Sequence, residues 1–396
     1  MMLPELILKK NEEKRIRSGH PWVYSNEINT SLTPLKNFLA GDEVVVKAHD
    51  QSILGVAYIN PHSLITARLF TTDRNQRLDG HFFKEKITAA LELRDALFNE
   101  PYYRLIFSEA DALPGLVVDR FAEDFVIQVN TAGMEQKIEI IAQAFLSVFP
   151  AIHSIFLRND SAIRKQEGLE LYTKPLYGVP PDEIKVIENG IPFLAPHKTG
   201  QKTGWFYDHR MNRARLKDYV KDKNVLDVFS YVGGFGIEAA VFGAKEVDCI
   251  ESSETACRFI EKNAILNQVN HQVNVIREDA LDAMKALLAQ NKKYGVIILD
   301  PPAFVKKAKD YKAGLLGYQR LNEEAIKLLA RGGILISCSC SMHVSMDDLT
   351  HVLKQAAFRT KSQLQILERR YQGPDHPLHI AIPESDYLKA IFTRKV

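Results

Sequence analysis

The sequence predicts an α/β protein in which a doubly wound parallel sheet follows a small β-barrel or sandwich and a mixed α+β domain. From about residue 186 onward, strand-like and helix-like runs alternate, which is typical of a parallel sheet with helices on both faces. Residues 1–73 hold short strand-like runs between turn residues, and residues 74–185 mix the two patterns. We therefore predict three domains, 1–73, 74–185 and 186–396, because 396 residues exceed what one core ordinarily serves.

The predicted barrel contains three apolar runs bounded by Gly, Asp, Asn and Pro: GDEVVVKAHD, SILGVAYINP and LITARLF. Ahead of them, KKNEEKRIRSGHPWVY interleaves basic side chains with aromatic ones. Such a pattern suits an RNA backbone with bases available for stacking. The predicted RNA contacts here are Lys14, Arg15, Arg17, His20 and Trp22. The alternative is a solvated helix face followed by core aromatics.

The predicted middle domain begins with HFFKEKITAALELRDALF, whose apolar residues recur at helical spacing. GLVVDRFAEDFVIQVN has the pattern of a hairpin that turns at residues 122–124. MEQKIEIIAQAFLSVF is helical again, and SIFLRND is extended.

Composition limits the class of protein. No run of about 18 apolar residues is present, so no membrane span is expected. The N-terminal residues lack the order of a signal peptide, and we expect a cytoplasmic protein. Four cysteines, two of them one residue apart, form neither a disulfide framework nor a zinc motif, and no metal site is predicted.

In a doubly wound sheet, ligands bind outside the carboxyl ends of the strands. After NVLDVFS comes YVGGFG, a glycine-rich turn into a helix, where backbone can pass close to a ligand. The next strand ends at Glu251, placed to hold ribose hydroxyls, and the third ends at Asp279, placed near an adenine amino group. The fourth ends in LDPPAF with Asp300. Each acid alone could be a helix cap, but acids after successive strands indicate a nucleoside cofactor.

This order resembles the class I S-adenosylmethionine-dependent methyltransferases, which have a Rossmann-like domain, over about the last 200 residues. A closer resemblance is to the RlmI-type 23S rRNA (cytosine-5) methyltransferases, through GQKTGWFYDHRMNR, SEADALPGLVVDRF, DHP at 375–377 and PESDYLKAIF. SGHPWVYSNEI resembles the entry of their N-terminal PUA domain, an RNA-binding β-barrel. The chain departs from the family's D-G-L-P-G at Ala112.

The resemblance implies S-adenosylmethionine as cofactor, ribosomal RNA as partner and a homodimer. It implies that GQKTGWFYDHR is a lid, with Phe206 and Asp208 near the cofactor and Lys202 and Arg210 near RNA phosphate. The remaining cofactor contacts expected are Asp227, Phe229, Ser230, Tyr231, Gly233, Glu251, Asp279 and Asp300.

The segment GGILISCSCSMH contains Cys338 and Cys340. With disulfide and zinc set aside, each thiol is either core filler or a nucleophile. The family's nucleophile lies at the end of this strand, so the resemblance implies that Cys340 attacks the base and Cys338 is buried. Asp300 is then expected to recognise cytosine. The alternatives are 5-methyluridine formation, methylation of a base amino group, or a non-catalytic RNA-binding assembly factor.

Overall fold

The computed structural model describes residues 3–396, which form two compact units. Unit 1 comprises the chain up to Ile184, together with His197–Trp205 and Pro374–Pro383. Unit 2 comprises Lys185–Pro196, Phe206–Gly373 and Glu384–Val396. The three domain ranges predicted from the sequence stay predictions. None of the helices described is long and apolar enough to cross a membrane.

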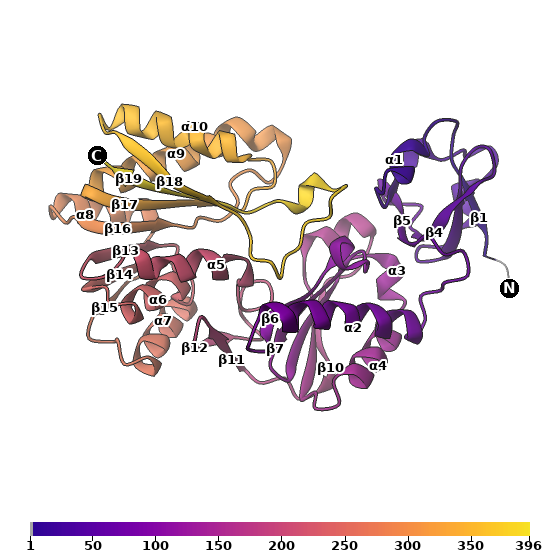
Figure 1. The fold of residues 1–396 in the computed structure, drawn as a ribbon, viewed down its shortest axis with the longest axis horizontal. Coiled ribbons are helices and arrows are strands. Elements are labelled where there is room, and N and C mark those ends of the chain that lie inside the picture. The colour runs from indigo at the N-terminus through magenta and orange to yellow at the C-terminus, as the bar shows by residue number, and fades with distance from the viewer. Residues whose placement is uncertain (1–2) are drawn as a thin grey trace. The chain divides into compact units, whose positions relative to one another are not determined.

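The first sheet of unit 1 is the small barrel (indigo in Figure 1). Its strand order is β1-β3-β4-β5-β2, and a bridge between Leu8 and Ile28 joins the segments that follow its two edge strands. Buried aliphatic side chains such as Val44, Val46 and Ile59 fill its interior. The elements are β1 (Glu5–Ile7), α1 (Lys14–Arg17), β2 (Trp22–Tyr24), β3 (Glu43–Lys47), β4 (Ile53–Ile59) and β5 (Ile65–Thr71).

The second sheet of unit 1 has the order β10-β9-β8-β7-β6, antiparallel except for the parallel pair β8–β9. The hairpin β7–β8 turns at Ala122 and Glu123, within the range that the sequence predicted. Apolar faces of α2 and α4 pack on this sheet. The elements are α2 (Gly80–Leu97), β6 (Tyr102–Phe107), β7 (Leu116–Phe121), β8 (Asp124–Val129), α3 (Ala132–Glu135), α4 (Ile138–Val148), β9 (Ser154–Asn159) and β10 (Tyr172–Gly178).

Unit 2 is built on a seven-stranded sheet with the order β15-β14-β13-β16-β17-β19-β18. Neighbouring strands are parallel from β15 to β17, and β19 is antiparallel to both of its neighbours. The strands are β13 (Asn224–Val228), β14 (Glu246–Ile250), β15 (Val273–Ile276), β16 (Tyr294–Leu299), β17 (Leu329–Ser339), β18 (Leu364–Arg370) and β19 (Lys389–Lys395). The hairpin of β11 (Glu183–Glu188) and β12 (Ile191–Pro196) precedes them.

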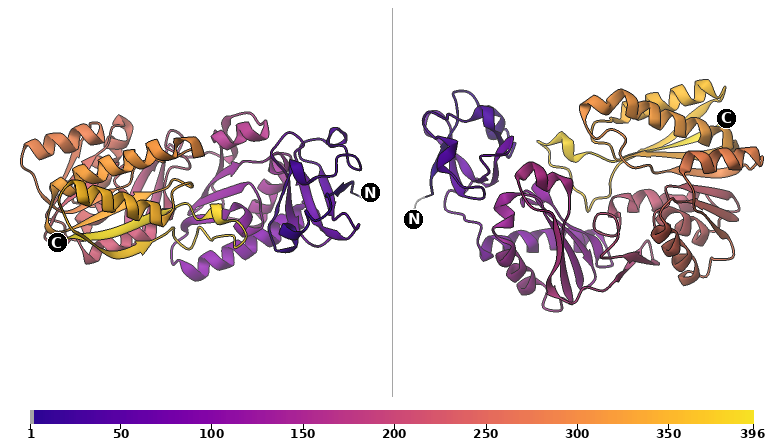
Figure 2. Two further views of the ribbon diagram at one scale, coloured as in Figure 1. Left: turned by 90° about the horizontal axis from the view of Figure 1, so that it is seen from above. Right: turned by 180° about the vertical axis from the view of Figure 1, so that it is seen from behind.

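Helices cover both faces of this sheet, with α9 and α10 over one face and α6 and α7 over the other (Figures 1 and 2). Strand order reverses between β13 and β16, which is where a doubly wound sheet binds its ligand. The predicted Rossmann-like α/β fold with an N-terminal barrel is thus confirmed. The helices are α5 (Arg210–Arg213), α6 (Gly234–Val241), α7 (Glu254–Leu266), α8 (Ala280–Ala289), α9 (Tyr311–Leu328) and α10 (Met346–Arg359).

Candidate functional site

The turn after β13 is the most strained backbone near the switch point. Phe229 and Tyr231, which carry side chains, have φ values of +67° and +50°, and Gly233 follows at +87°. Left-handed conformations cost energy for residues other than glycine, and they cluster at ligand-binding sites. Asn263, which is fully buried, donates from Nδ2 to the carbonyl of Val232 at 2.9 Å. The surrounding fold therefore holds this turn in place.

Asp227, the penultimate residue of β13, has a carboxylate whose hydrogen-bonding capacity is only partly used. Its Oδ2 accepts from the backbone N–H of Gly236 at 2.9 Å, whereas its buried Oδ1 has no hydrogen-bond partner in residues 3–396. Burial raises the pKa of Asp227 to about 7, although the bonds from Ser230 and Gly236 oppose the shift. A buried acceptor without a partner indicates a place for a ligand's hydrogen-bond donor.

Glu251 and Asp279 follow the next two strands of the sheet. Glu251 is half-buried, and it accepts from the N–H of Tyr231 at 2.9 Å and of Ser253 at 2.8 Å, so it also braces the strained turn. Asp279 is exposed, and its Oδ1 caps α8 by accepting from Leu281 N–H at 2.9 Å. Asp279 thus serves as the helix cap that the sequence allowed for, and its contact with adenine stays a prediction.

Asp300, at the end of β16, forms an ion pair with His209 across 3.1 Å. Burial lowers the pKa of the His209 imidazole, but the charge and hydrogen bond of Asp300, together with the charge of Asp208, outweigh burial and raise that pKa above its usual value. The thiol of Cys338 completes a group whose N, O and S atoms lie within 4.8 Å of one another. The ion pair accounts for His209 and Asp300 without a metal, and the expectation of no metal site stays a prediction.

The two neighbouring cysteines differ in exposure. Cys338 is the penultimate residue of β17, pairs with Ala390 of β19 and is fully buried. Burial raises the pKa of its thiol well above the ordinary value, and the nearby charge of Asp300 adds to the shift. Cys340 lies just past the strand end, is partly exposed, and has its Sγ 3.9 Å from the carbonyl oxygen of Pro301. Only Cys340 thus combines exposure with a position beside the D-P-P turn.

Lys389 is a buried cation close to Cys340, and its role was not foreseen from the sequence. It opposes Ser339 in the pairing of β19 with β17, and its Nζ donates to the carbonyl of Ser341 at 2.8 Å. Burial lowers the pKa of Lys389, whereas Asp386 and Cys340 oppose the shift. A buried ammonium beside a partly exposed thiol favours the thiolate form of that thiol.

Three residues of the expected lid, Phe206, Asp208 and Arg210, lie in unit 2, in the segment before β13. The ring of Phe206 meets that of Tyr231 edge to face with centroids 5.4 Å apart. Asp208 is buried and accepts from the hydroxyl of Tyr387 at 2.6 Å. Arg210 is also buried, 3.5 Å from Glu188, so its charge is balanced within the protein. Lys202 is exposed and belongs to unit 1.

The barrel residues predicted to bind RNA divide into two groups. Lys14 and Arg17 are exposed on α1. Arg15 instead donates to Glu27 at 2.7 Å and lies 3.1 Å from a ring nitrogen of His20, and Trp22 donates from Nε1 to Glu109 at 2.8 Å. Arg15, His20 and Trp22, the second group, therefore hold one another and neighbouring residues in place within unit 1. RNA contact by either group stays a prediction.

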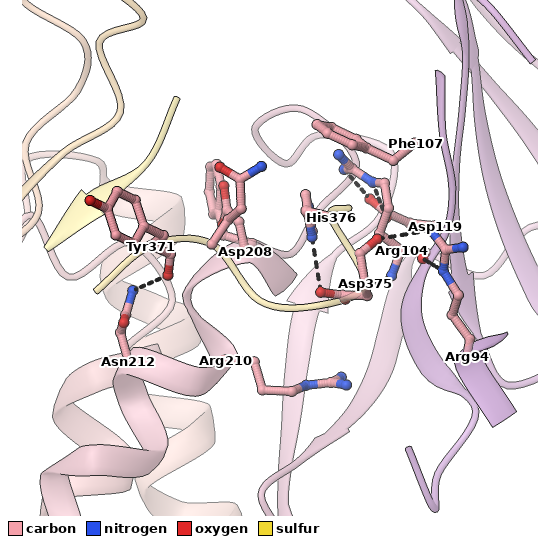
Figure 3. A network of polar contacts seen from close by, with 12 residues as sticks. Arg94, Arg104, Phe107, Asp119, Asp208, Arg210, Asn212, Tyr371, Asp375 and His376 are labelled. Carbon is pink, nitrogen blue, oxygen red and sulfur yellow. Dashed lines mark hydrogen bonds and ion pairs between the residues drawn. The ribbon is translucent and has the colours of Figure 1, made fainter. Parts of the chain in front are cut away.

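The DHP segment folds back onto the middle sheet of unit 1 (Figure 3). Arg94 is fully buried and pairs with Asp111 through two bonds of 2.6 and 2.8 Å. Arg94 also donates to the backbone carbonyl of Asp375 at 3.0 Å, and the Asp375 carboxylate accepts from Arg104 N–H at 3.1 Å. His376 lies 3.0 Å from the other oxygen of Asp375. We call Arg94, Asp111, Asp375 and His376 the arginine cluster.

Four features together define a class I methyltransferase. The order of the sheet reverses between β13 and β16, the turn after β13 is strained, Asp227 has a buried acceptor oxygen, and acids follow four strands. Proteins of this class use S-adenosylmethionine as their cofactor.

Comparison with known proteins agrees with this class. A family model described as "PUA-like domain" matches residues 6–72, and one described as "Conserved hypothetical protein 95" matches residues 212–358. The chain is 36% identical to ribosomal RNA large subunit methyltransferase I of Pseudoalteromonas atlantica, covering 99% of this chain and 100% of that protein. It is 37% identical to the protein of that name from Aeromonas salmonicida, covering 98% of each. The chain therefore belongs to the ribosomal RNA large subunit methyltransferase I family.

Solved structures share the fold along the whole chain. A putative methyltransferase complexed with SAH superposes with a TM-score of 0.84 at 20% identity, covering 99% of this chain and 100% of that one. A putative SAM-dependent methyltransferase from Streptococcus mutans gives a TM-score of 0.83 at 20% identity, with the same coverage of both chains.

Sequence reasoning overlooked His209 and Lys389 as parts of this site. Both lie inside motifs that were singled out, YDHR and YLKAIF, but as neighbours of the residues given roles. An ionisable residue within an otherwise apolar strand such as LKAIF is the signal that could have identified Lys389, because buried charges are rare unless they have a function.

Proposed function

We propose that this chain methylates carbon 5 of a cytosine in large-subunit ribosomal RNA, with Cys340 as the nucleophile. The observation that carries the proposal is the partly exposed thiol of Cys340 beside the D-P-P turn, in a chain whose relatives are named as ribosomal RNA large subunit methyltransferases. S-adenosylmethionine supplies an electrophilic methyl group when bound.

The chemistry needs a thiolate because carbon 5 of cytosine is a poor nucleophile. The sulfur of Cys340 forms a bond to carbon 6, and the former double-bond electrons make carbon 5 nucleophilic enough to take the methyl group. Loss of the carbon 5 proton to a base and departure of the thiolate then restore the double bond. Every bond made to the enzyme is thereby broken again.

The residues around Cys340 support this role. The ammonium of Lys389, on β19, donates to the carbonyl of Ser341, the residue after Cys340. A cation in this position favours the thiolate of Cys340. We infer that Lys389 is a positioning residue. Asp300 is partly exposed beside the same turn and can accept from the amino edge of cytosine, while its pairing with His209 fixes its orientation.

Partners and location complete the proposal. Ribosomal RNA is the substrate that the relatives' names support. A homodimer is proposed from the family resemblance, and light scattering on the purified chain tests it. The cytoplasmic location expected from the sequence stays part of the proposal.

The test of the proposed chemistry uses Cys340→Ala and Cys338→Ala as a matched pair. We expect Cys340→Ala to lose methyl transfer by at least about 10³-fold while it keeps its fold and cofactor binding, because no other thiol near the turn is exposed. Cys338→Ala should lose some stability and keep most of its activity. Mass spectrometry of nucleosides from treated RNA measures the 5-methylcytosine formed.

RNA that contains 5-fluorocytosine gives a second readout. Fluorine blocks loss of the carbon 5 substituent, so the wild type and Cys338→Ala should accumulate a covalent complex and Cys340→Ala should not. Full activity of Cys340→Ala would refute the mechanism and favour methylation of a base amino group, which needs no thiol.

A further inference from the structure

The segment that runs from the loop after β16 into the first turn of α9 carries four exposed lysines in seven residues: Lys306, Lys307, Lys309 and Lys312. None of their ammonium groups has a hydrogen-bond or ion-pair partner in residues 3–396. The one acid in this stretch is Asp310, which is partly buried. Elsewhere in unit 2, several basic side chains are balanced, as Arg213 is by Glu188 and Arg215 by Glu368. This segment (306–312), which we call the lysine loop although its last two residues begin α9, is a local excess of positive charge.

Hydrogen bonds tie the base of the lysine loop to the two serines that flank Cys340. The N–H of Val305 donates to the hydroxyl of Ser341 at 3.2 Å. The hydroxyl of Tyr318, on α9, lies 2.9 Å from that of Ser341 and accepts from that of Ser339 at 3.0 Å. The start of the loop and the nucleophile's strand end are thus parts of one buried network.

Glycines on α9 let the loop pack closely against the helix. A Cβ on Gly314 would lie 2.3 Å from a methyl carbon of Val305, and one on Gly317 would lie 3.0 Å from the ring of Phe304. The ring of Phe304 in turn packs against Tyr318, with centroids 4.8 Å apart. The lysine loop begins directly after Val305, which bonds to Ser341, the residue after Cys340. The start of the loop is therefore held beside the strand end that carries the proposed nucleophile.

We propose that the lysine loop binds the phosphates of the RNA strand that carries the target base. The inference rests on the proposed RNA substrate and adds to it a binding surface in the catalytic unit, separate from the barrel. Lysine ammonium groups suit phosphates as mobile point charges, and contacts of this kind give affinity without reading sequence. The first turn of the 18-residue α9 adds a positive dipole end to the same place.

The experiment compares two variants that lose the same charge from the same unit. One is K306Q/K307Q/K309Q/K312Q. The control is K217Q/K221Q/K245Q/K354Q, in which all four lysines are exposed and none has an ion-pair partner in residues 3–396. Lys221 and Lys245 precede β13 and β14, so they lie at the sheet edge opposite the site. The probe is a transcript of large-subunit ribosomal RNA, and its affinity is measured over a range of salt concentrations.

We expect the lysine-loop variant to lose at least about tenfold in RNA affinity near 0.1 M salt. The slope of log K against log salt should become less steep by about 2 to 3, since each contact with a single strand contributes about 0.7. S-adenosylmethionine binding by calorimetry should be unchanged in both variants, which shows that both are folded. The control should bind RNA as the wild type does.

Equal losses in the two variants would overturn the proposal, because net charge alone would then explain them. Unchanged affinity and slope in the lysine-loop variant would also overturn it while leaving the proposed function intact. A wild type that does not bind the transcript would refute the RNA partner itself. Because binding is measured without methyl transfer, an error about Cys340 affects none of these readings.

Discussion

In the arginine cluster of unit 1, both carboxylate oxygens of Asp111 accept hydrogen bonds from Arg94 or from backbone, whereas in unit 2 Asp227 keeps one buried oxygen without a partner in residues 3–396. Both regions contain buried carboxylates within motifs that resemble one enzyme family. The difference indicates their roles. A saturated network stabilises the fold, and an incomplete one at a strand end leaves hydrogen-bonding capacity for a ligand.

The largest expected effect comes from breaking the saturated network. Arg94→Met should lower the free energy of unfolding of unit 1 by about 3–5 kcal/mol, because it leaves the carboxylate of Asp111 buried without its charge partner. Both tryptophans of the chain, Trp22 and Trp205, belong to unit 1, so tryptophan fluorescence in urea reports on that unit.

The double variant R94M/D111N is the control for this prediction, because it removes both charges. It should be less destabilised than Arg94→Met alone. If the free energy of unfolding falls by less than about 1 kcal/mol in the single variant, the arginine cluster does not stabilise unit 1 in the way proposed.

The next effect concerns Glu251, the acid after the strand next to that of Asp227. Glu251→Ala should weaken S-adenosylmethionine binding by about 1.5–3 kcal/mol, because it removes a charged acceptor of ligand hydroxyls. Calorimetry measures the affinity. Since Glu251 also accepts from the N–H of Tyr231, Glu251→Gln separates the two roles: it keeps an acceptor for the turn and loses the charge. If Glu251→Ala binds the cofactor as the wild type does, the assignment of strand-end acids is wrong.

A smaller effect concerns the ion pair of His209 with Asp300. The pKa of His209 is raised in the folded protein, chiefly by Asp300 and also by Asp208, while burial and Arg213 oppose the shift. The pair therefore contributes its full stability below the unfolded pKa of about 6.5, and the contribution is lost as pH rises through the higher folded pKa.

Far-UV circular dichroism in urea measures this pH dependence, with His209→Gln as the comparison. The wild type should lose more stability than the variant as pH rises above about 6.5. Identical pH dependence in the two proteins would mean that His209 is neutral in the folded state.

The smallest effect tests the departure from the family's glycine. Ala112 has a φ of +55° at the end of a 3₁₀ turn, a conformation that costs a residue with a Cβ about 1 kcal/mol or more. Ala112→Gly should therefore stabilise unit 1 by roughly 0.5–1 kcal/mol, measured by tryptophan fluorescence in urea. The matched control is Ala89→Gly, in the exposed middle of α2, which should cost about 1 kcal/mol. Loss of stability in both variants would contradict the strain argument.

Much of the site could be predicted because parallel βα units bring successive strand ends to one edge of a sheet. That rule placed Glu251, Asp279 and Asp300 at one edge of the sheet from local sequence patterns, and the family resemblance added Asp227. It could not place Lys389, since the position of β19 beside β17 depends on a long-range antiparallel pairing that leaves no local signal. It could not place Asp375 in the arginine cluster either, because the bond to Arg94 joins residues 281 positions apart.

The return of Pro374–Pro383 to unit 1 has a consequence for synthesis on the ribosome. Domains of many proteins fold one after another as the chain emerges, the N-terminal one first. Here the arginine cluster of unit 1 cannot form before Asp375 is synthesised, and the sheet of unit 2 is incomplete before β19, which ends at Lys395. Both units are therefore completed within the same short interval of translation. Until then, the nascent chain lacks the last segment of each unit, so the bond between Arg94 and Asp375 forms only when synthesis is almost finished.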